Sequence, residues 1–505
     1  MRYGFVIDHN RCIGCHACTV ACKEEHDVPL GVFRTWVKYI EKGQFPDTRR
    51  YFGVLRCNHC DDAPCVEICP TNALFRRRDG IVDFNGERCI GCKSCMQACP
   101  YDALYIDPRT QTAAKCNYCA HRVEVGLEPA CVIVCPEQAI IAGDLDDPGS
   151  KIGRIVATEK VSMRKPEKGT RPKLFYLGIE EDLLQPAMIV PQKSYFWAEK
   201  DPREVVYDSE DKSRPAPGSA REVYDVAHPQ PWGSNIASYL WTKSIAAGVL
   251  LIAAFLPYLG FESERALLNI VSPVLALIFT GITTLLLVTD LKRPERFYYI
   301  LIKPNLRSWL VWGGYFLIFY GFLSALWLLL GFTQNSVPRA LCWLTVILAI
   351  CSACYSAFLF AQAKGRDLWQ SPLFFWHLLV QAITAGAATM MIAAAAFQAE
   401  PAFIEGLARV LGISLFLGFV MILGELFLPH TNEQVRRATD LLKNGSLSRS
   451  FWGLAIALGL LAPLVLLGLL GGFPGAYVLA SVFALAGLWF FDDLWLKAGQ
   501  AIPLS

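Results

Sequence analysis

The chain has 505 residues, enough for two or three domains, and its net charge at pH 7 is only +2. This near-neutral balance argues against a nucleic-acid partner. Hydrophobic residues make up 53% of the chain and are concentrated after about residue 230, whereas the part before it is polar and holds most of the 19 cysteines. The composition therefore predicts a cysteine-rich part followed by a membrane part.

Four runs of cysteines lie within the first 150 residues. The run from Cys89 to Pro100 reads C-I-G-C-K-S-C-M-Q-A-C-P, the spacing typical of bacterial [4Fe–4S] ferredoxins. Its close spacing lets three thiolates hold one cube, while the fourth thiolate reaches a neighbouring cube and the proline ends the segment. The four runs are Cys12, Cys15, Cys18 and Cys22; Cys57, Cys60, Cys65 and Cys69; Cys89, Cys92, Cys95 and Cys99; and Cys116, Cys119, Cys131 and Cys135.

Disulfides and zinc are the alternatives for these cysteines. A disulfide framework is typical of exported proteins, and residues 1–8 contain neither a signal-peptide stretch nor a twin arginine. Zinc sites accept C-x2-C pairs, but the full ferredoxin spacing is not usual for zinc. We therefore predict four [4Fe–4S] clusters in a domain that stays in the cytoplasm, unless a signal-bearing partner exports it.

Short strands are predicted beside the cysteine runs, at residues 4–7, 80–83, 103–106 and 139–142. Each run and its strand form a small repeated unit in which the clusters supply much of the core. Residues 1–150 are therefore predicted to be an α+β, ferredoxin-like tandem iron–sulfur domain. The long insertion between Cys22 and Cys57 is either a surface for a partner subunit or an ordinary surface loop.

Residues 151–234 are rich in proline and charge. The stretches Lys165-Pro166-Glu167 and Pro215-Ala216-Pro217-Gly218 are typical of extended chain. We predict a polar connector that packs on the cluster domain and leads into the membrane.

Residues 235–505 contain eight apolar stretches, each close to the roughly 20 residues that span a bilayer. They are rich in Leu, Ala, Phe and Gly, which favours an all-α bundle of eight transmembrane helices over buried helices of a soluble protein. The predicted spans are 237–259, 267–290, 308–332, 341–363, 373–397, 407–428, 451–472 and 476–496.

The loops between these spans predict an orientation. An even number of spans places both ends of the membrane domain on one side, whose loops and ends hold twelve Lys and Arg residues. The opposite loops offer only Arg265, Arg339 and Arg409. Because cytoplasmic loops carry the excess of positive charge, we predict an inner-membrane protein whose iron–sulfur domain faces the cytoplasm.

Ionisable residues inside apolar spans are candidates for function. All of those here are predicted near the cytoplasmic face: Lys243, Asp290, His377, Glu425, Asp492 and Asp493. The first and the last two fit interfacial charges that reach the headgroups or cap helix ends. The other three are better explained by a function.

A quinone needs two hydrogen-bonding groups at its carbonyls, a proton donor or acceptor, and an apolar slot. Polar side chains at one membrane face would supply these groups. Asn235 and Tyr239, one helical turn apart in the first span, are included unless they only form an interfacial belt. The candidate quinone-site residues are Asp290, His377, Glu425, Asn235, Tyr239 and Arg293.

Two parts of the chain resemble known families. Residues 1–190 resemble the four-cluster iron–sulfur subunit of molybdopterin oxidoreductases of the polysulfide and dimethyl sulfoxide reductase type. The resemblance is carried by C-N-H-C at 57–60, K-C-N-Y-C at 115–119 and G-T-R-P-K at 169–173. Residues 230–505 resemble the NrfD-like, quinone-interacting membrane subunit of polysulfide reductase, through D-L-K-R-P-E-R-F at 290–297 and G-Q at 499–500.

The resemblance implies how the ligands pair. The four sets would be Cys12, Cys15, Cys18 and Cys135; Cys22, Cys116, Cys119 and Cys131; Cys57, Cys60, Cys65 and Cys99; and Cys69, Cys89, Cys92 and Cys95. Two features depart from the family: the two subunits are fused, and many relatives face the periplasm. A histidine expected on the first span is also not evident.

These observations predict the electron-transfer and membrane-anchor subunit of a respiratory molybdopterin oxidoreductase complex. Electrons would pass through four clusters between the quinone or menaquinone pool and a separate catalytic subunit. That partner, which would carry the molybdopterin, would act on a sulfur compound, an arsenic oxyanion or formate. Two alternatives stay open: a module of a redox-driven ion-translocating complex, and a passive membrane anchor without a quinone site.

Overall fold

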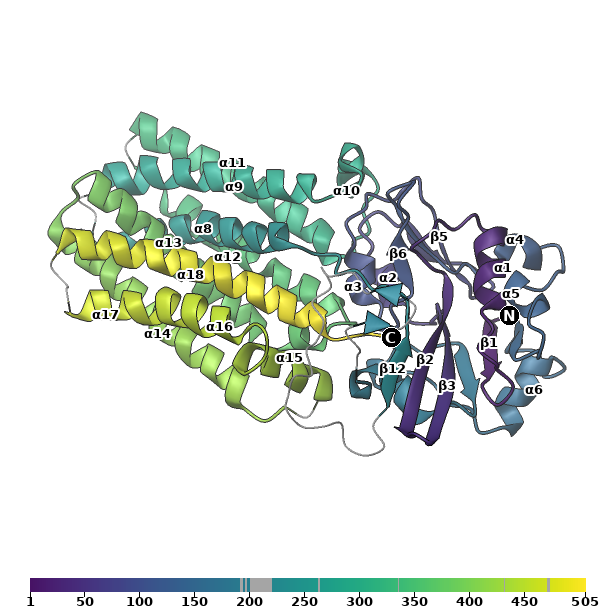
Figure 1. Cartoon of the computed structure of the whole chain (residues 1–505). Helices are drawn as coiled ribbons and strands as arrows, with labels where there is room; N and C mark the ends of the chain where they lie inside the picture. The colour runs from purple at the N-terminus through teal and green to yellow at the C-terminus, as the bar shows by residue number, and fades with distance from the viewer. Residues whose placement is uncertain are drawn as a thin grey trace.

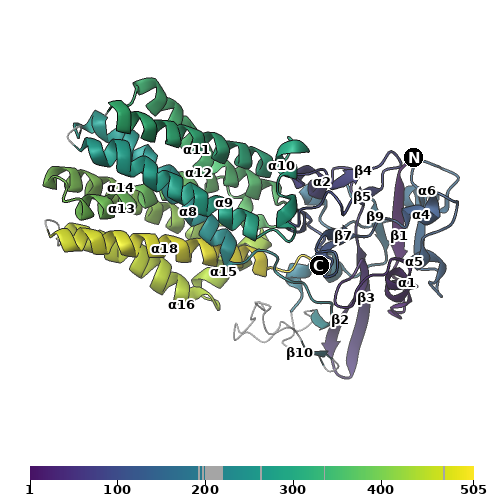
Figure 2. The ribbon, with the colours of Figure 1, turned by 90° about the horizontal axis from the view of Figure 1, so that it is seen from above.

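A bundle of long helices and a smaller α/β part lie end to end (Figure 1). The computed structural model describes residues 1–190, 194–195, 198–199, 220–261, 264–334, 336–430, 432–469 and 473–505. The view from above shows the same division, with the purple N-terminal strands at one end and the green and yellow helices at the other (Figure 2). The predicted α+β domain followed by an all-α membrane bundle is confirmed.

The first sheet of the α/β part has the order β8–β1–β9. Its central strand β1 (Tyr3–Asp8) pairs antiparallel with β8 (Ile140–Asp144) and parallel with β9 (Leu174–Leu177). Alternate residues of β1 point to opposite faces. Phe5 therefore packs among the cysteine helices, whereas Val6 packs on Ile152 of helix α6 (Lys151–Thr158).

The second sheet is built from the insertion between the first two cysteine runs. Strands β2 (Thr35–Gln44) and β3 (Asp47–Arg56) form a hairpin that pairs with β12 (Arg221–Tyr224). Lys38 of β2 is buried and ion-pairs with Glu222 at 3.1 Å and Asp225 at 2.8 Å. A large part of the insertion is therefore held by later segments of its own chain.

The region predicted as an extended connector is more structured than its composition indicates. Its first part forms α6 and β9, and its last part forms β12. The proline-rich and charged sequence does not predict these elements, because short strands at the edge of a sheet depend on pairing with distant strands rather than on a local periodic pattern. The stretch Pro215–Gly218 lies outside the described residues.

The cysteine runs are set among short hairpins and one- to two-turn helices. The hairpins are β4 (Leu74–Arg76) with β5 (Val82–Phe84), and β6 (Leu104–Ile106) with β7 (Ala113–Lys115). The helices are α1 (Ala17–Glu25), α2 (Pro64–Ile68), α3 (Ser94–Ala98), α4 (Ala120–Val123) and α5 (Ala130–Ile133). Other short elements are α7 (Glu181–Leu184), β10 (Ser194–Tyr195), β11 (Ala198–Glu199), α10 (Tyr299–Ile302), α15 (Glu433–Lys443) and α16 (Ser448–Ser450).

Within the described residues, eight helices are long and apolar enough to cross a membrane. The spans are Ser234–Tyr258, Leu267–Thr289, Trp309–Gln334, Arg339–Gln362, Phe374–Ala396, Pro401–Phe427, Ser448–Leu469 and Gly475–Ala501. Their main helices are α8 (Ser234–Phe255), α9 (Ser272–Thr289), α11 (Trp309–Gln334), α12 (Arg339–Gln362), α13 (Phe374–Ala396), α14 (Pro401–Phe427), α17 (Ala462–Leu469) and α18 (Pro474–Ala501).

Helices α8 and α13 form the centre of the bundle. The apolar windows of their spans are 89% and 72% buried inside the protein, against 28% for those that contain α9 and α14. The two backbones touch at Gly248 and Gly386, where a Cβ on either residue would overlap the other helix. Small residues at such crossings allow membrane helices to pack closely.

The C-terminal residues join the two parts. Carbonyl oxygens of Leu504 and Ser505 accept hydrogen bonds from Arg164 and Lys38 at 2.9 Å each. At the same junction, Gln500 of α18 accepts a hydrogen bond from Gln97 of α3 at 2.6 Å. The α/β part is therefore fixed against one end of the helix bundle.

Candidate redox site

Sixteen cysteines form four groups in the α/β part, and none of the 19 cysteines is in a disulfide. We number the groups 1 to 4: Cys12, Cys15, Cys18 and Cys135; Cys22, Cys116, Cys119 and Cys131; Cys57, Cys60, Cys65 and Cys99; and Cys69, Cys89, Cys92 and Cys95. Among the described residues, no three Cys, His, Asp or Glu side chains converge on a single-ion site.

Group 4 is seen most directly, because one cavity is lined by all four of its cysteines. The loop that carries three of them turns at Gly91, whose φ of 70° suits glycine. Backbone N–H groups of Gly91 and Ala113 donate to Cys89 Sγ at 3.4 and 3.3 Å. Such donors stabilise negative charge on sulfur, as a cluster ligand requires.

Group 3 joins residues from two separate runs. Burial raises the pKa of the Cys60 thiol, and the neighbouring Cys57 and Cys99 raise it further. Burial likewise raises the pKa of Cys65, to which Cys99 and Cys57 add. Cys99 therefore lies beside the three cysteines of the preceding run.

Groups 1 and 2 exchange their last members in the same way. Burial raises the pKa of Cys12, and Cys135 and Cys15 contribute as neighbouring charges. Burial raises the pKa of Cys22, and the nearby Cys116 adds to it. Thiols of the first run thus lie beside thiols of the fourth run.

The four groups follow one another in the order 1, 2, 3, 4. At each step, burial raises the pKa of a thiol and a cysteine of the next group raises it further. The neighbouring pairs are Cys18 and Cys131, Cys116 and Cys57, and Cys95 and Cys65. Group 4 lies at the membrane end of this series.

Two buried cations lie among the groups. Arg56 is 1% exposed and donates through Nη1 to Cys131 Sγ at 3.0 Å. Lys115 is fully buried and its Nζ lies 3.5 Å from Cys57 Sγ. Burial alone lowers the pKa of Lys115, but Cys57 and other thiolates outweigh it and raise that pKa. These cations offset the negative charge of thiolates and their clusters, so the residues present fit [4Fe–4S] groups.

An apolar cavity of about 240 Å³ lies between group 4 and the membrane helices. Cys92 lines both this cavity and the cavity of group 4. The wall comes from α8, α9, α11, α12 and the segment after α9, and includes Trp232, Ile236, Tyr239, Thr284, Leu287, Asp290, Phe297, Ile300, Gly314, Leu317, Tyr355 and Phe360. We call it the junction cavity.

Asp290 is in the wall of the junction cavity and pairs with the cluster loop. Its carboxylate lies 2.8 Å from Lys93 Nζ, and the two side chains are only 13% and 8% exposed. Lys93 follows Cys92 directly. The pair therefore ties the end of α9 to the loop that holds group 4.

Tyr239 of α8 also lines the junction cavity. Its hydroxyl contacts the hydroxyls of Tyr355 and of Ser356, the latter at 2.7 Å. Tyr355 has no motif that would have identified it from the sequence, since a tyrosine in an apolar helix is common. The structure thus presents two phenol groups at the edge of the cavity.

Other predicted residues lie elsewhere. Asn235 is exposed and does not line the cavity, because the neighbouring Ile236 and Tyr239 occupy the inner face of α8. Arg293 donates to the carbonyl oxygen of Thr110 at 2.8 Å, so it clasps the iron–sulfur part. Arg296 does the same at Cys89, at 3.1 Å.

His377 and Glu425 come together in a second place. His377 Nε2 lies 3.1 Å from Glu425 Oε2, without the alignment of a hydrogen bond. His377 lines a smaller cavity of about 40 Å³ between α13, α14 and α18, which also includes Gln381 and Ser414. We call it the inner cavity. Its lining shares no residue with that of the junction cavity.

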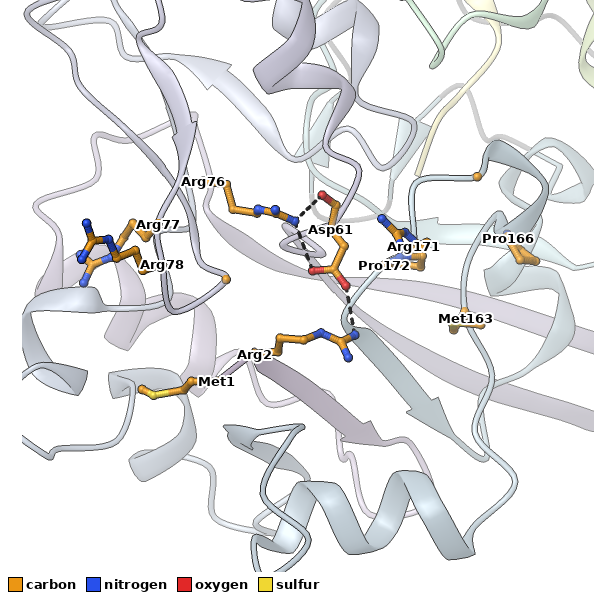
Figure 3. A pocket seen from close by; sticks show the side chains of 12 residues that line it. Met1, Arg2, Asp61, Arg76, Arg77, Arg78, Met163, Pro166, Arg171 and Pro172 are labelled. Atoms are coloured by element: carbon orange, nitrogen blue, oxygen red, sulfur yellow. Dashed lines mark hydrogen bonds and ion pairs between the residues drawn. The ribbon is translucent and has the colours of Figure 1, made fainter.

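A larger cavity than these two, about 870 Å³, is a basic cleft on the α/β part (Figure 3). Its arginines are largely paired: Arg2 reaches Asp61 at 3.0 Å, and Arg76 donates to the Asp61 carbonyl oxygen at 2.8 Å. None of the sixteen cysteines lines it. Its size therefore does not make it part of the redox site.

The comparisons with known proteins agree with this division. Residues 222–503 match the family described as "Polysulphide reductase, NrfD". Residues 49–145 and 11–74 match two models of the 4Fe-4S dicluster domain. The membrane family thus covers the helix bundle, and the dicluster models cover the cysteine groups.

Several relatives resemble about a third of the chain. The B subunit of tetrathionate reductase from Salmonella typhimurium is 47% identical over 192 residues, which cover 37% of this chain and 76% of the relative. The B subunit of polysulfide reductase from Wolinella succinogenes is 45% identical over 34% of this chain and 93% of the relative. The arsenate respiratory reductase iron-sulfur subunit ArrB of Shewanella is 36% identical over 35% and 96%. This multi-pass membrane protein therefore belongs to the NrfD polysulphide reductase family and carries a 4Fe–4S iron–sulfur domain in the same polypeptide.

Proposed function

We propose that the chain carries electrons between a quinone, such as menaquinone, in the junction cavity and a separate catalytic subunit. In this proposal, the sixteen cysteines of groups 1 to 4 hold four [4Fe–4S] clusters. The iron–sulfur domain spans residues 1–150, the connector 151–234 and the membrane domain 235–505. The twelve-to-three charge bias supports an inner membrane with the iron–sulfur domain on the cytoplasmic side.

The observation that carries the proposal is the shared wall at Cys92. One ligand candidate of group 4 borders an apolar cavity that opens among membrane helices. A cavity of about 150 Å³ holds a benzene ring, so about 240 Å³ accommodates a substituted quinone ring. Redox partners on either side of one side chain are close enough for electron exchange.

The polar groups of the junction cavity suit a quinone. Tyr239 and Tyr355 offer hydroxyls for one carbonyl oxygen, and Asp290, which pairs with Lys93, is a further charged group of the wall. The remaining wall is apolar and receives the ring and tail. Oxidising a quinol releases two electrons and two protons, so acid–base groups beside a one-electron carrier are required.

Group 1 is the natural exit toward the partner. Cys15 is exposed, and Ile13 beside it is 56% exposed. The relatives' names concern tetrathionate, polysulfide and arsenate reductases, which supports a molybdopterin-containing partner for sulfur compounds or arsenic oxyanions. Formate remains a further candidate substrate. A passive anchor would not need the junction cavity.

The test uses the purified full chain in lipid nanodiscs without oxygen. Iron and sulfide analysis should give about sixteen of each per chain. A menaquinol analogue should then reduce the clusters, followed by their visible absorbance and electron paramagnetic resonance. Far fewer irons, or clusters that dithionite reduces but quinol does not, would contradict the proposal.

A further inference from the structure

Polar and ionisable side chains lead away from the junction cavity into the helix bundle. Lys243 of α8 is fully buried and donates to Ser356 Oγ at 2.6 Å. Ser356 in turn contacts the hydroxyl of Tyr239, which lines the junction cavity, at 2.7 Å. A hydrogen-bonded connection therefore runs from the cavity wall to a buried amine.

Lys243 does not reach the interface, as an interfacial charge would. It lies nine residues after the start of α8 at Ser234, or about 14 Å along the helix. Its ammonium instead lies 4.7 Å from the ring centre of Tyr355. Burying an ammonium group among apolar helices costs free energy, and such residues inside membrane spans usually have a function.

The next group is Asp492 of α18, which is 4% exposed. It is close enough to Lys243 for the two charges to interact, without a direct hydrogen bond between these two described residues. Its Oδ2 accepts a hydrogen bond from Gln381 Nε2 at 2.5 Å. Gln381 lines the inner cavity together with His377.

The inner cavity leads back toward the loops beside the iron–sulfur domain. His377 lies in the first turn of α13, close to Glu425 near the end of α14. Glu425 interacts with Ser371 and His430, both in loops at that end of the bundle. Polar groups thus extend from the junction cavity to the surface by an indirect route.

We propose that this series is the path by which protons enter or leave the junction cavity, an inference that rests on the proposed quinone reaction. Each quinol oxidised loses two O–H bonds, and its two electrons leave toward group 4. The proton of the hydroxyl beside the tyrosines passes from Tyr239 through Ser356 and Lys243 to Asp492, and then by water in the inner cavity to His377 and Glu425. The proton of the other hydroxyl goes to the Asp290 carboxylate in the cavity wall. Gln381 is a positioning residue that orients Asp492.

The side chains of this path differ in whether they can carry a proton. Hydroxyl, amine, carboxyl and imidazole groups each give up and take back a proton, whereas the Gln381 amide does not. In this proposal, water carries the proton between Lys243 and Asp492, whose charges interact without a direct hydrogen bond between these two described residues. Both ends of the path lie on the side of the iron–sulfur domain, so electrons and protons are exchanged at the same membrane face.

The test compares two adjacent buried carboxylates on α18. Asp492→Asn removes the carboxylate of the path, whereas Asp493→Asn removes a neighbour that is 5% exposed and pairs with Lys497 at 2.5 Å. We expect D492N to lower kcat for quinol-driven electron transfer by at least tenfold, at an unchanged KM for quinol. D493N should keep kcat near that of the wild type.

Three further measurements make the result specific. D492E should recover most of kcat, a small weak acid such as formic acid should partly rescue D492N, and dithionite should reduce the clusters of all variants equally. Equal loss of kcat in D492N and D493N, or no loss in D492N, overturns the path. If D492N does not assemble, His377→Gln is measured instead, with the same expected and contradicting results.

This design separates the two proposals. If quinol does not reduce the clusters of the wild type, the proposed function itself fails. If the wild type reacts and D492N matches D493N, only the proton path fails.

Discussion

Filling the junction cavity should block quinol oxidation without harming the clusters. Gly314 lines this cavity, and a Cβ there would meet only Ile300 Cγ2, at an ordinary 3.7 Å. A phenylalanine ring needs about 150 Å³, so Gly314→Phe would leave roughly 90 Å³ of the 240 Å³ present, too little for a second ring. A ring of about 150 Å² is stabilised by burial by roughly 4 kcal/mol, or nearly a thousandfold in affinity.

Because the quinone keeps part of its contacts in the tail region, we expect KM for a menaquinol analogue to rise at least tenfold in G314F. The assay follows absorbance loss of the clusters after quinol addition in nanodiscs. The control is Gly321→Phe, two turns along α11, where a Cβ meets only Thr280 Cγ2, at 3.9 Å, and which is not among the residues that line the junction cavity. Equal kinetics in G314F and G321F would refute the assignment of this cavity.

Three other predictions test the supports of the site. Asp290→Asn should lower the thermal stability of the purified protein by the equivalent of about 3–5 kcal/mol, because it leaves Lys93 buried without its partner at 2.8 Å. The double variant K93M/D290N should be much less destabilised. Equal losses of stability in the two variants would contradict this account of the pair. Arg56→Met should lower the midpoint potential of at least one cluster in a redox titration, because a nearby cation favours the reduced state, and Arg56→Lys should retain most of the wild-type value. Burial lowers the pKa of His228, but Asp225 and Asp102 outweigh burial and raise that pKa to about 10. Protonated His228 therefore stabilises the fold fully below about pH 6.5, and this stabilisation is lost as the pH rises toward 10. The difference in melting temperature between the wild type and His228→Gln should shrink over that range.

The cluster ligands and the membrane helices were predictable because their signals are local. A cysteine at every third residue, as from Cys89 to Cys95, predicts iron–sulfur ligands from a single loop. An apolar stretch of about 20 residues states its length in the same way. Some helix ends differ from the prediction: the sixth span starts at Pro401, before the predicted residue 407. This difference arises because polar residues at a helix end dilute the apolar signal.

The cavity wall could not be predicted, because it depends on how each helix is rotated about its axis. Helix α8 is buried on nearly all sides, so its sequence has no periodic pattern that distinguishes Asn235 from Ile236. The first is exposed and the second lines the cavity. Tyr355 lies on α12, which is far from α8 in the sequence. The sequence of α12 is also apolar, so it does not show that Tyr355 faces the cavity.

Long-range pairs were also beyond local patterns. The sequence predicts a function for Asp290, which stays a prediction, but it does not predict that Lys93 pairs with Asp290. Lys243 was expected at the interface, because an amine on a long stem usually reaches water, yet Ser356 and Tyr355 hold it inside the bundle. Such partners become visible only when distant helices are packed together.

The most direct measurement of the central claim is photolabelling by an azido-quinone in nanodiscs, followed by peptide mapping. We predict labels on residues of the junction cavity, such as Tyr239, Leu301 and Leu317, that disappear when excess menaquinol analogue is added. Labels confined to the inner cavity around His377, or spread over the lipid-facing surface without competition, would contradict a quinone site beside Cys92.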